Sequence, residues 1–351
     1  MEIRTLEVDE IEAVLQLLSG WDAPQGGRHP DAFRRQMQLD PTFQEHNLWV
    51  AVERGEVVAC AQIHPRRLRI LGHAIPAGGL GPVFTRPDFR RHGVATTLIE
   101  RAATAMRERG MELSLAFSRE PRLFGRLGWH PWRGQRCILR RTDKDAVPAR
   151  LRERASEIEI VSLEPTRDRA LSAVKAIHNA YSGPRNGVVI RDDALWDASL
   201  RLAGNPAEEF LVARRGGLAV AYARAALLDE GLTLTEVGRF EDGAGALAQL
   251  VVHLLEPRSD DPLAPPGRTS EEIRSFAVMS TFDDLGLTVG LEHQGVASHP
   301  FDDDSGLIRC LNLHALAGRL DVELLAGEDG PAFLKRILPP DGFVFWPADR
   351  F

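Results

Sequence analysis

The stretch GPVFTRPDFRRHGVATTLIERAATAMRERG, residues 81–110, predicts a strand followed by a helix. The apolar run ends before Pro87, and two arginines, a histidine and a glycine occupy positions 90–93. From there apolar residues recur at helical spacing, and Gly110 is a typical residue to end the helix. The expected apolar face consists of Val94, Leu98, Ile99, Ala102, Ala105 and Met106. The helix therefore begins directly after a cluster of basic side chains.

The first turn of such a helix is suited to bind an anion. Its leading N–H groups have no partner within the helix, and they carry the positive end of the helix dipole. Gly93 would let a phosphate approach the backbone closely. Arg90 and Arg91 would add charge-assisted hydrogen bonds, and His92 mainly its backbone N–H. The competing interpretation is a basic loop on a solvated surface.

Length, charge and cysteine usage limit the class of protein. A chain of 351 residues predicts two domains, and a net charge of −7 argues against a general nucleic-acid binder. Cys60, Cys137 and Cys310 are far apart and show neither metal-ligand spacing nor a disulfide framework, so no metal and a reducing cytoplasm are expected. The N-terminus is charged, and no apolar run approaches ~20 residues, which predicts neither an export signal nor a membrane span.

The order of strand and helix signals occurs twice along the chain. Alternating apolar residues flank the turn Arg54–Gly55 in the first half and the turn Gly216–Gly217 in the second. In each half a further strand, an amphipathic helix and another strand follow; the second helix is DGAGALAQLVVHLLE, residues 242–256, and IRSFAV, residues 273–278, is the last strand. This repeated order predicts an internal duplication. The tail FLKRILPPDGFVFWPADRF, residues 333–351, is apolar enough to predict packing onto the protein.

Two other phosphate-binding motifs can be compared with the chain. The Walker pattern is absent, which argues against nucleotide hydrolysis by that route. Gly243, Gly245 and Ala248 fit G-x-G-x-x-A, but the strands around them alternate as hairpins do. Dinucleotide binding is therefore not expected in the second half.

Three segments resemble a known family. FRRHGVA, residues 89–95, is similar to the [RQ]-x-x-G-x-[GA] signature of the GCN5-related N-acetyltransferases (GNAT). FSREPRLFGRLGWHPW, residues 117–132, and SGLIRCLNLHALAGR, residues 305–319, are similar to segments of the enhanced-intracellular-survival (Eis) type. The resemblance implies an α/β (α+β) fold with a mixed, mostly antiparallel GNAT-type sheet flanked by helices.

The same resemblance implies a domain organisation. Residues 1–141 would form an acetyl-CoA-binding GNAT domain, residues 142–157 a linker, and residues 158–306 a second, degenerate GNAT-like domain. Residues 307–351 resemble a truncated sterol-carrier-like segment. Eis-like proteins commonly assemble, so a homo-oligomer is expected.

Acetyl-CoA is the acyl donor that the resemblance implies. Its pantetheine arm would bind the backbone of the strand before the signature, and its pyrophosphate the N–H groups of the helix start. The expected cofactor-binding residues are Val83, Phe84, Thr85, Arg90, Arg91, His92, Gly93, Val94, Ala95, Thr96, Ser118 and Arg119. Arg119 stands where this group usually has glutamate. We expect no basic residue beside Gly243, and we therefore expect the second half to bind no coenzyme A.

The catalytic residues that the resemblance implies are only partly present. The group uses a tyrosine as general acid, and Phe124 occupies that position here. The group's base is the C-terminal carboxylate, which in this chain belongs to Phe351. Ser118, Glu120 and His130 are alternative candidates near the thioester, although a structural role or a solvent-exposed position is the more common one for such residues.

The acceptor site is the least specified part of the sequence. Trp129 and Trp132 fit either its lining or the core, and Asp302, Asp303 and Asp304 fit either attraction of a cation or a solvated loop. The expected function is acetyl transfer from coenzyme A to a primary amine of a small molecule by direct attack on the thioester. The alternatives are a catalytically silent acyl-CoA-binding or regulatory module and a protein lysine acyltransferase.

Overall fold

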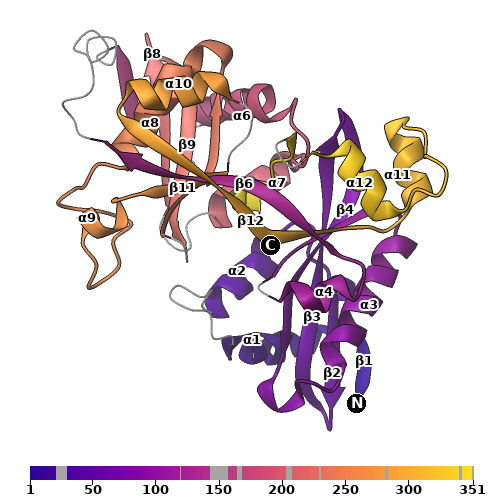
Figure 1. The fold of residues 1–351 in the computed structure, drawn as a ribbon. Coiled ribbons are helices and arrows are strands. Elements are labelled where there is room, and N and C mark those ends of the chain that lie inside the picture. Colours follow the sequence, from indigo (N-terminus) through magenta and orange to yellow (C-terminus); the bar gives the residue numbers. More distant parts are fainter. Residues whose placement is uncertain are drawn as a thin grey trace.

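The structure is a computed structural model, drawn in Figure 1. It describes residues 1–20, 30–118, 120–142, 157–163, 168–202, 208–228, 231–280, 284–339 and 342–349. The strands are β1 (Glu2–Thr5), β2 (Leu48–Glu53), β3 (Glu56–Ile70), β4 (His73–Thr85), β5 (Leu113–Phe117), β6 (His130–Arg141), β7 (Ile158–Ser162), β8 (Glu208–Arg215), β9 (Leu218–Leu228), β10 (Gly231–Arg239), β11 (Ala277–Ser280) and β12 (Val296–Cys310). The helices are α1 (Ile11–Ser19), α2 (Pro30–Leu39), α3 (Val94–Glu108), α4 (Pro121–Gly125), α6 (Asp168–Ser182), α7 (Asp193–Leu202), α8 (Ala244–Leu254), α9 (Ser270–Ile273), α10 (Leu285–His293), α11 (Leu313–Leu320) and α12 (Gly330–Ile337).

One mixed, mostly antiparallel sheet runs through the molecule. Its strand order is β1-β2-β3-β4-β5-β12-β6-β11-β10-β9-β8-β7, and helices flank it, so the predicted fold class is confirmed. The predicted hairpin at Arg54–Gly55 joins β2 to β3, and both turn residues have positive φ. No helix within the described ranges is long and apolar enough to cross a bilayer.

The first half of the sheet opens between two of its strands. β4 pairs in parallel with β5 only from Ala77 to Leu80, opposite Leu113 to Ala116. Beyond Leu80, β4 continues to Thr85 along β3 alone. The two parallel strands therefore part at the end that precedes α3.

The second half repeats this arrangement, which confirms the predicted duplication. β8, β9 and β10 are antiparallel, and β10 pairs in parallel with β11 from Leu232 to Leu234, with α8 in the connection. The strand predicted for residues 273–278 begins only at Ala277. The prediction was wrong before that point because Thr269 and Glu272 form a capping box that starts α9.

The two halves exchange strands. In the first half, Gly306–Ile308 of β12 lies between β5 and β6. In the second half, Arg136–Leu139 of β6 lies between β11 and β12. Figure 1 shows β6 and β12 crossing together from one half to the other. Each half is thus completed by a strand of the other, and β12 runs through the predicted domain boundary at residues 306–307.

Helices cover both faces of the sheet. The apolar face predicted for α3 is buried on the first half, while α11, α12 and the tail pack against β4, β5 and β12. α8 and α10 pack together on the second half, opposite α6. Phe343, Val344 and Trp346 are buried, which confirms that the tail packs onto the protein. Of the predicted linker, residues 143–156 lie outside the described residues.

Candidate functional site

The start of α3 forms an open cradle of backbone N–H groups. Arg91 and Gly93 have φ of 66° and 79°, and the first helical hydrogen bond runs from Thr97 N to Gly93 O at 3.0 Å. The N–H groups of residues 91–96 have no acceptor within the described chain. A Cβ atom at Gly93 would meet no other atom within 4 Å. These features fit a phosphate group at the helix N-terminus.

The basic side chains beside this cradle differ in availability. Arg90 donates from Nε to the Thr85 carbonyl at 3.0 Å, which ties it to the end of β4. Arg86 forms ion pairs with Glu56 and Asp88. Arg91, His92 and Gly93 are exposed, as a contact with a ligand from solution requires. Arg91 is therefore the basic side chain beside the cradle that is most accessible to an anion.

The unpaired edge of β4 leads to the cradle. Val83, Phe84 and Thr85 pair with β3 on one side, and on the other side no strand of the described chain pairs with β4 beyond Leu80. The Thr85 hydroxyl is buried and has no hydrogen-bond partner among the described residues. An extended arm carrying amides can pair with such an edge as a strand would. Of the residues predicted to hold acetyl-CoA, those at positions 83–85 and 90–96 thus follow one path from β4 to α3.

A buried charged cluster, not foreseen from the sequence, lies beneath the opening. His64 places Nδ1 at 3.2 Å from Asp40 Oδ2 and Nε2 at 2.6 Å from the Gly81 carbonyl. Arg66 donates from Nη2 to Asp40 Oδ2 at 2.6 Å. Burial opposes ionisation of Asp40, but the hydrogen bond with His64 and the charge of Arg66 outweigh it and hold the pKa of this carboxyl well below its usual range. The cluster fixes the point at which β4 turns away from β5.

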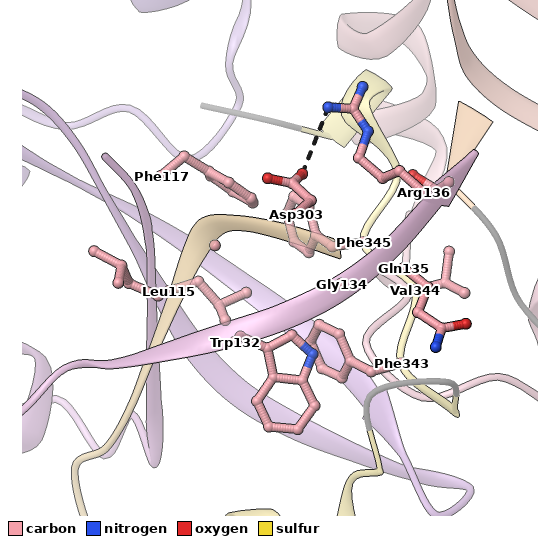
Figure 2. Close-up of a pocket in the computed structure, with 13 residues that line it drawn as sticks. Leu115, Phe117, Trp132, Gly134, Gln135, Arg136, Asp303, Phe343, Val344 and Phe345 are labelled. Atoms are coloured by element: carbon pink, nitrogen blue, oxygen red, sulfur yellow. Dashed lines mark ion pairs between the residues drawn. The ribbon is translucent and has the colours of Figure 1, made fainter. Parts of the chain in front are cut away.

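A pocket of about 50 Å³ lies at the end of β5 (Figure 2). Its aromatic walls come from Phe117, Trp132, Phe343 and Phe345. The ring centroids of Phe117 and Phe345 are 5.3 Å apart, and those of Trp132 and Phe343 are 4.9 Å apart. Its charged residues are Arg136 and Asp303, which form an ion pair at 3.5 Å. Strands of both halves and the tail together build this pocket.

The pocket adjoins the opening in the sheet. Ala116 is the last residue of β5 that pairs with β4, and Phe117 follows it directly. The structure places Trp132 and Asp303 in the pocket and Trp129 in the core. Asp302 is exposed, and the side chain of Asp304 lies outside the described residues. Of the two strands that part for the expected cofactor, β5 therefore ends at an aromatic pocket with one carboxylate.

The other residues singled out in the sequence differ in their surroundings. Ser118 donates its N–H to the Ser305 carbonyl at 3.1 Å, and its hydroxyl accepts from Glu120 N at 3.0 Å. Glu120 and His130 are exposed. Phe124 is buried, with its ring edge-on to that of Trp129. Arg119 and Phe351 lie outside the described residues, and no group of side chains within the described ranges could hold a metal ion.

The equivalent position in the second half is enclosed. Contrary to the sequence analysis, a basic residue lies near Gly243: Arg239 approaches it closely. Arg239 is engaged, however, through Nη2 to Asp284 Oδ1 at 2.6 Å. A Cβ atom at Gly243 would lie 2.4 Å from the Val220 carbonyl oxygen, and one at Gly290 of α10 would lie 3.2 Å from Ala248 of α8. Gly243 thus packs against protein where Gly93 is open, although Gly245 in the first turn of α8 is exposed.

Comparison with known proteins identifies the class of fold and site. Residues 2–132 match the family model for the acetyltransferase (GNAT) domain. The chain therefore carries a GNAT acetyltransferase domain, a class that takes its acyl group from acetyl-CoA, and its two halves together have the fold of tandem GNAT proteins. No functionally curated protein matches the sequence.

Solved structures share this fold at low sequence identity. A GCN5-related N-acetyltransferase from Kribbella flavida is 16% identical with a TM-score of 0.62, over 90% of this chain and 72% of that one. Eis1 from Mycobacterium abscessus is 14% identical with a TM-score of 0.60, over 91% and 76%. A tandem GNAT protein from the clavulanic acid biosynthesis pathway is 14% identical with a TM-score of 0.53, over 89% and 98%. The Eis-like tandem arrangement implied by the sequence is thereby confirmed.

Proposed function

We propose that the protein transfers the acetyl group of acetyl-CoA to a primary amine of a small molecule by direct attack on the thioester. The observation that carries the proposal is the continuity of three features: the open cradle at α3, the unpaired edge of β4 and the aromatic pocket beside the end of β5. The GNAT domain would bind the acetyl donor, and the pocket of about 50 Å³ would receive the amine end of the acceptor.

The chain's own residues would hold the donor in an extended form. The backbone edge of Val83–Thr85 pairs with the pantetheine amides, and the N–H groups of residues 91–96 bind the pyrophosphate. Arg90 and Arg91 add positive charge there. Such binding holds the thioester at the opening between β4 and β5, next to the pocket.

The pocket favours an acceptor that carries an amine on an apolar group. Asp303 attracts an ammonium, and the faces of Trp132 and Phe343 add cation–π attraction and apolar contact. The positive charge of the neighbouring Arg136 offsets the negative charge of Asp303. Only an ammonium group that approaches Asp303 closely is therefore attracted. These features support an acceptor that presents a primary amine at the end of an apolar group.

The reaction needs one group to take a proton and one to give it. The amine nitrogen attacks the thioester carbonyl carbon, the carbon–sulfur bond breaks, and the proton lost by nitrogen neutralises the base. Glu120 is the first described carboxylate after β5, and the Ser118 hydroxyl, which accepts from Glu120 N, would donate a hydrogen bond to the departing thiolate. Phe124 has no proton to give. The carboxylate of Phe351 stays a predicted base.

A thiol-release screen over polyamines, aminoglycosides and amino acids tests the proposal. We expect turnover with at least one small amine, and we expect Asp303→Asn to raise the KM for that amine about tenfold. Asp302→Asn, which changes an exposed neighbour, is the matched control. Tight acetyl-CoA binding with no turnover on any amine would instead support the silent binding module, and turnover confined to lysine peptides would support a protein acyltransferase.

A further inference from the structure

The connection between α6 and α7 joins the second half to the edge of the first. Arg69 N donates to Val188 O at 2.9 Å, and Ile190 N donates to Arg67 O at 2.8 Å. Both bonds lie where β3 has run past the end of β2, so the connection extends the sheet on that edge. The connection is thereby fixed relative to β3 of the first half.

The tail lies on the other side of this connection. Val344 N donates to Asn186 O at 2.8 Å. Gly187 has φ of 89°, and ring carbons of Phe343 lie 2.7 Å from the place a Cβ atom would take. Any other residue at position 187 would displace the Phe343 ring, so Gly187 is required for Phe343 to take this position. Phe343 is also a wall of the aromatic pocket.

A buried ion pair holds the far end of the tail. Arg191 donates from Nε to Asp349 Oδ1 at 2.7 Å and from Nη2 to Asp349 Oδ2 at 2.8 Å. The Arg191 side chain is only 1% exposed, and its Nη2 also donates to Glu236 Oε2 at 2.5 Å. Its guanidinium lies 4.6 Å from the centre of the Trp196 ring. This two-point geometry orients the carboxylate as well as attracting it.

We propose that Arg191 is a positioning residue for the acceptor site. By holding Asp349 it fixes the tail from Phe343 to Asp349, so that Phe343 and Phe345 stand as walls of the pocket. Arg191 acts through the tail and touches neither acetyl-CoA nor the amine. This inference rests on the proposed function, because it assigns the acceptor to that pocket.

Asp349→Asn and Arg191→Lys test the role of the pair. Each weakens the two-point contact, and Arg191→Lys keeps the positive charge beside Glu236. We expect the KM for the amine to rise about tenfold or more, because displaced walls bind the acceptor poorly, while the Kd for acetyl-CoA stays within about twofold. Hydrogen exchange at Val344 N should quicken. The control is Arg336→Lys, since Arg336 makes the same two-point contact with Glu328 at the exposed end of α12.

The outcomes separate three possibilities. Faster exchange in the tail with an unchanged amine KM would overturn the positioning role, and unchanged exchange would overturn the anchoring itself. A rise in the Kd for acetyl-CoA equal to that in the amine KM would show general loss of structure and also overturn it. If the parent chain acetylates no amine, the proposed function fails, and the exchange measurement still decides whether Arg191 holds the tail.

Discussion

Replacement of Gly93 by alanine tests the cradle at the start of α3. At a φ of 79° a residue with a Cβ atom pays roughly 1–2 kcal/mol of stability. No steric cost is added, because no other atom lies within 4 Å of the new Cβ. The new methyl group would stand among the N–H groups that bind the pyrophosphate. We expect the Kd for acetyl-CoA to rise at least tenfold, equivalent to about 1.4 kcal/mol.

The matched control is Gly72→Ala in the turn between β3 and β4. Gly72 has φ of 82° and equally open surroundings, so alanine costs about the same stability there. Urea unfolding measures the stability of both variants, and calorimetric titration measures their affinity for acetyl-CoA. Equal affinities in Gly93→Ala and Gly72→Ala would refute the assignment of the cradle.

Three further expectations concern folding, pH and the missing acid. A chain cut after residue 141 lacks the part of β12 that pairs with β5. Hydrogen exchange of its amides should therefore show no stable sheet. A stably folded fragment would contradict the exchange of strands between the halves. Burial opposes ionisation of Asp261, but hydrogen bonds from Arg274 outweigh it and lower the pKa of Asp261 to about 2. This group therefore stabilises the fold above about pH 4 and less as the pH falls toward 2. Asp261→Asn should make the free energy of unfolding depend less on pH in this range. An unchanged pH dependence would contradict the role of Asp261. Phe124→Leu should cost about 1 kcal/mol of stability and leave kcat within about twofold, whereas a large loss of kcat would give Phe124 a chemical role.

The parts of the fold predicted from sequence are those with local signals. The hairpin at Arg54–Gly55 follows from strand alternation and a turn that needs positive φ. The limits of α3 follow from its apolar spacing and from Gly93 and Gly110 at its ends. The duplication was visible because each half repeats such local signals in one order.

Long-range pairing was not predictable from these patterns. The exchange of β6 and β12 depends on contacts between segments more than 150 residues apart. The alternation of apolar and polar residues within a strand does not indicate which strand pairs with it. The cluster of Asp40, His64 and Arg66 likewise forms only when β3 packs beside the loop after α2. The basic residue beside Gly243 is visible in the sequence, because Arg239 precedes that glycine by only four positions.

The binding of acetyl-CoA to the intact chain tests the central claim most directly. Isothermal titration should show one site per chain, because Gly93 before α3 is open whereas Gly243 before α8 packs against protein. Gly93→Glu should abolish that binding, since it places a bulky negative group in the cradle. No binding, two equivalent sites per chain, or one site unaffected by Gly93→Glu would contradict the account.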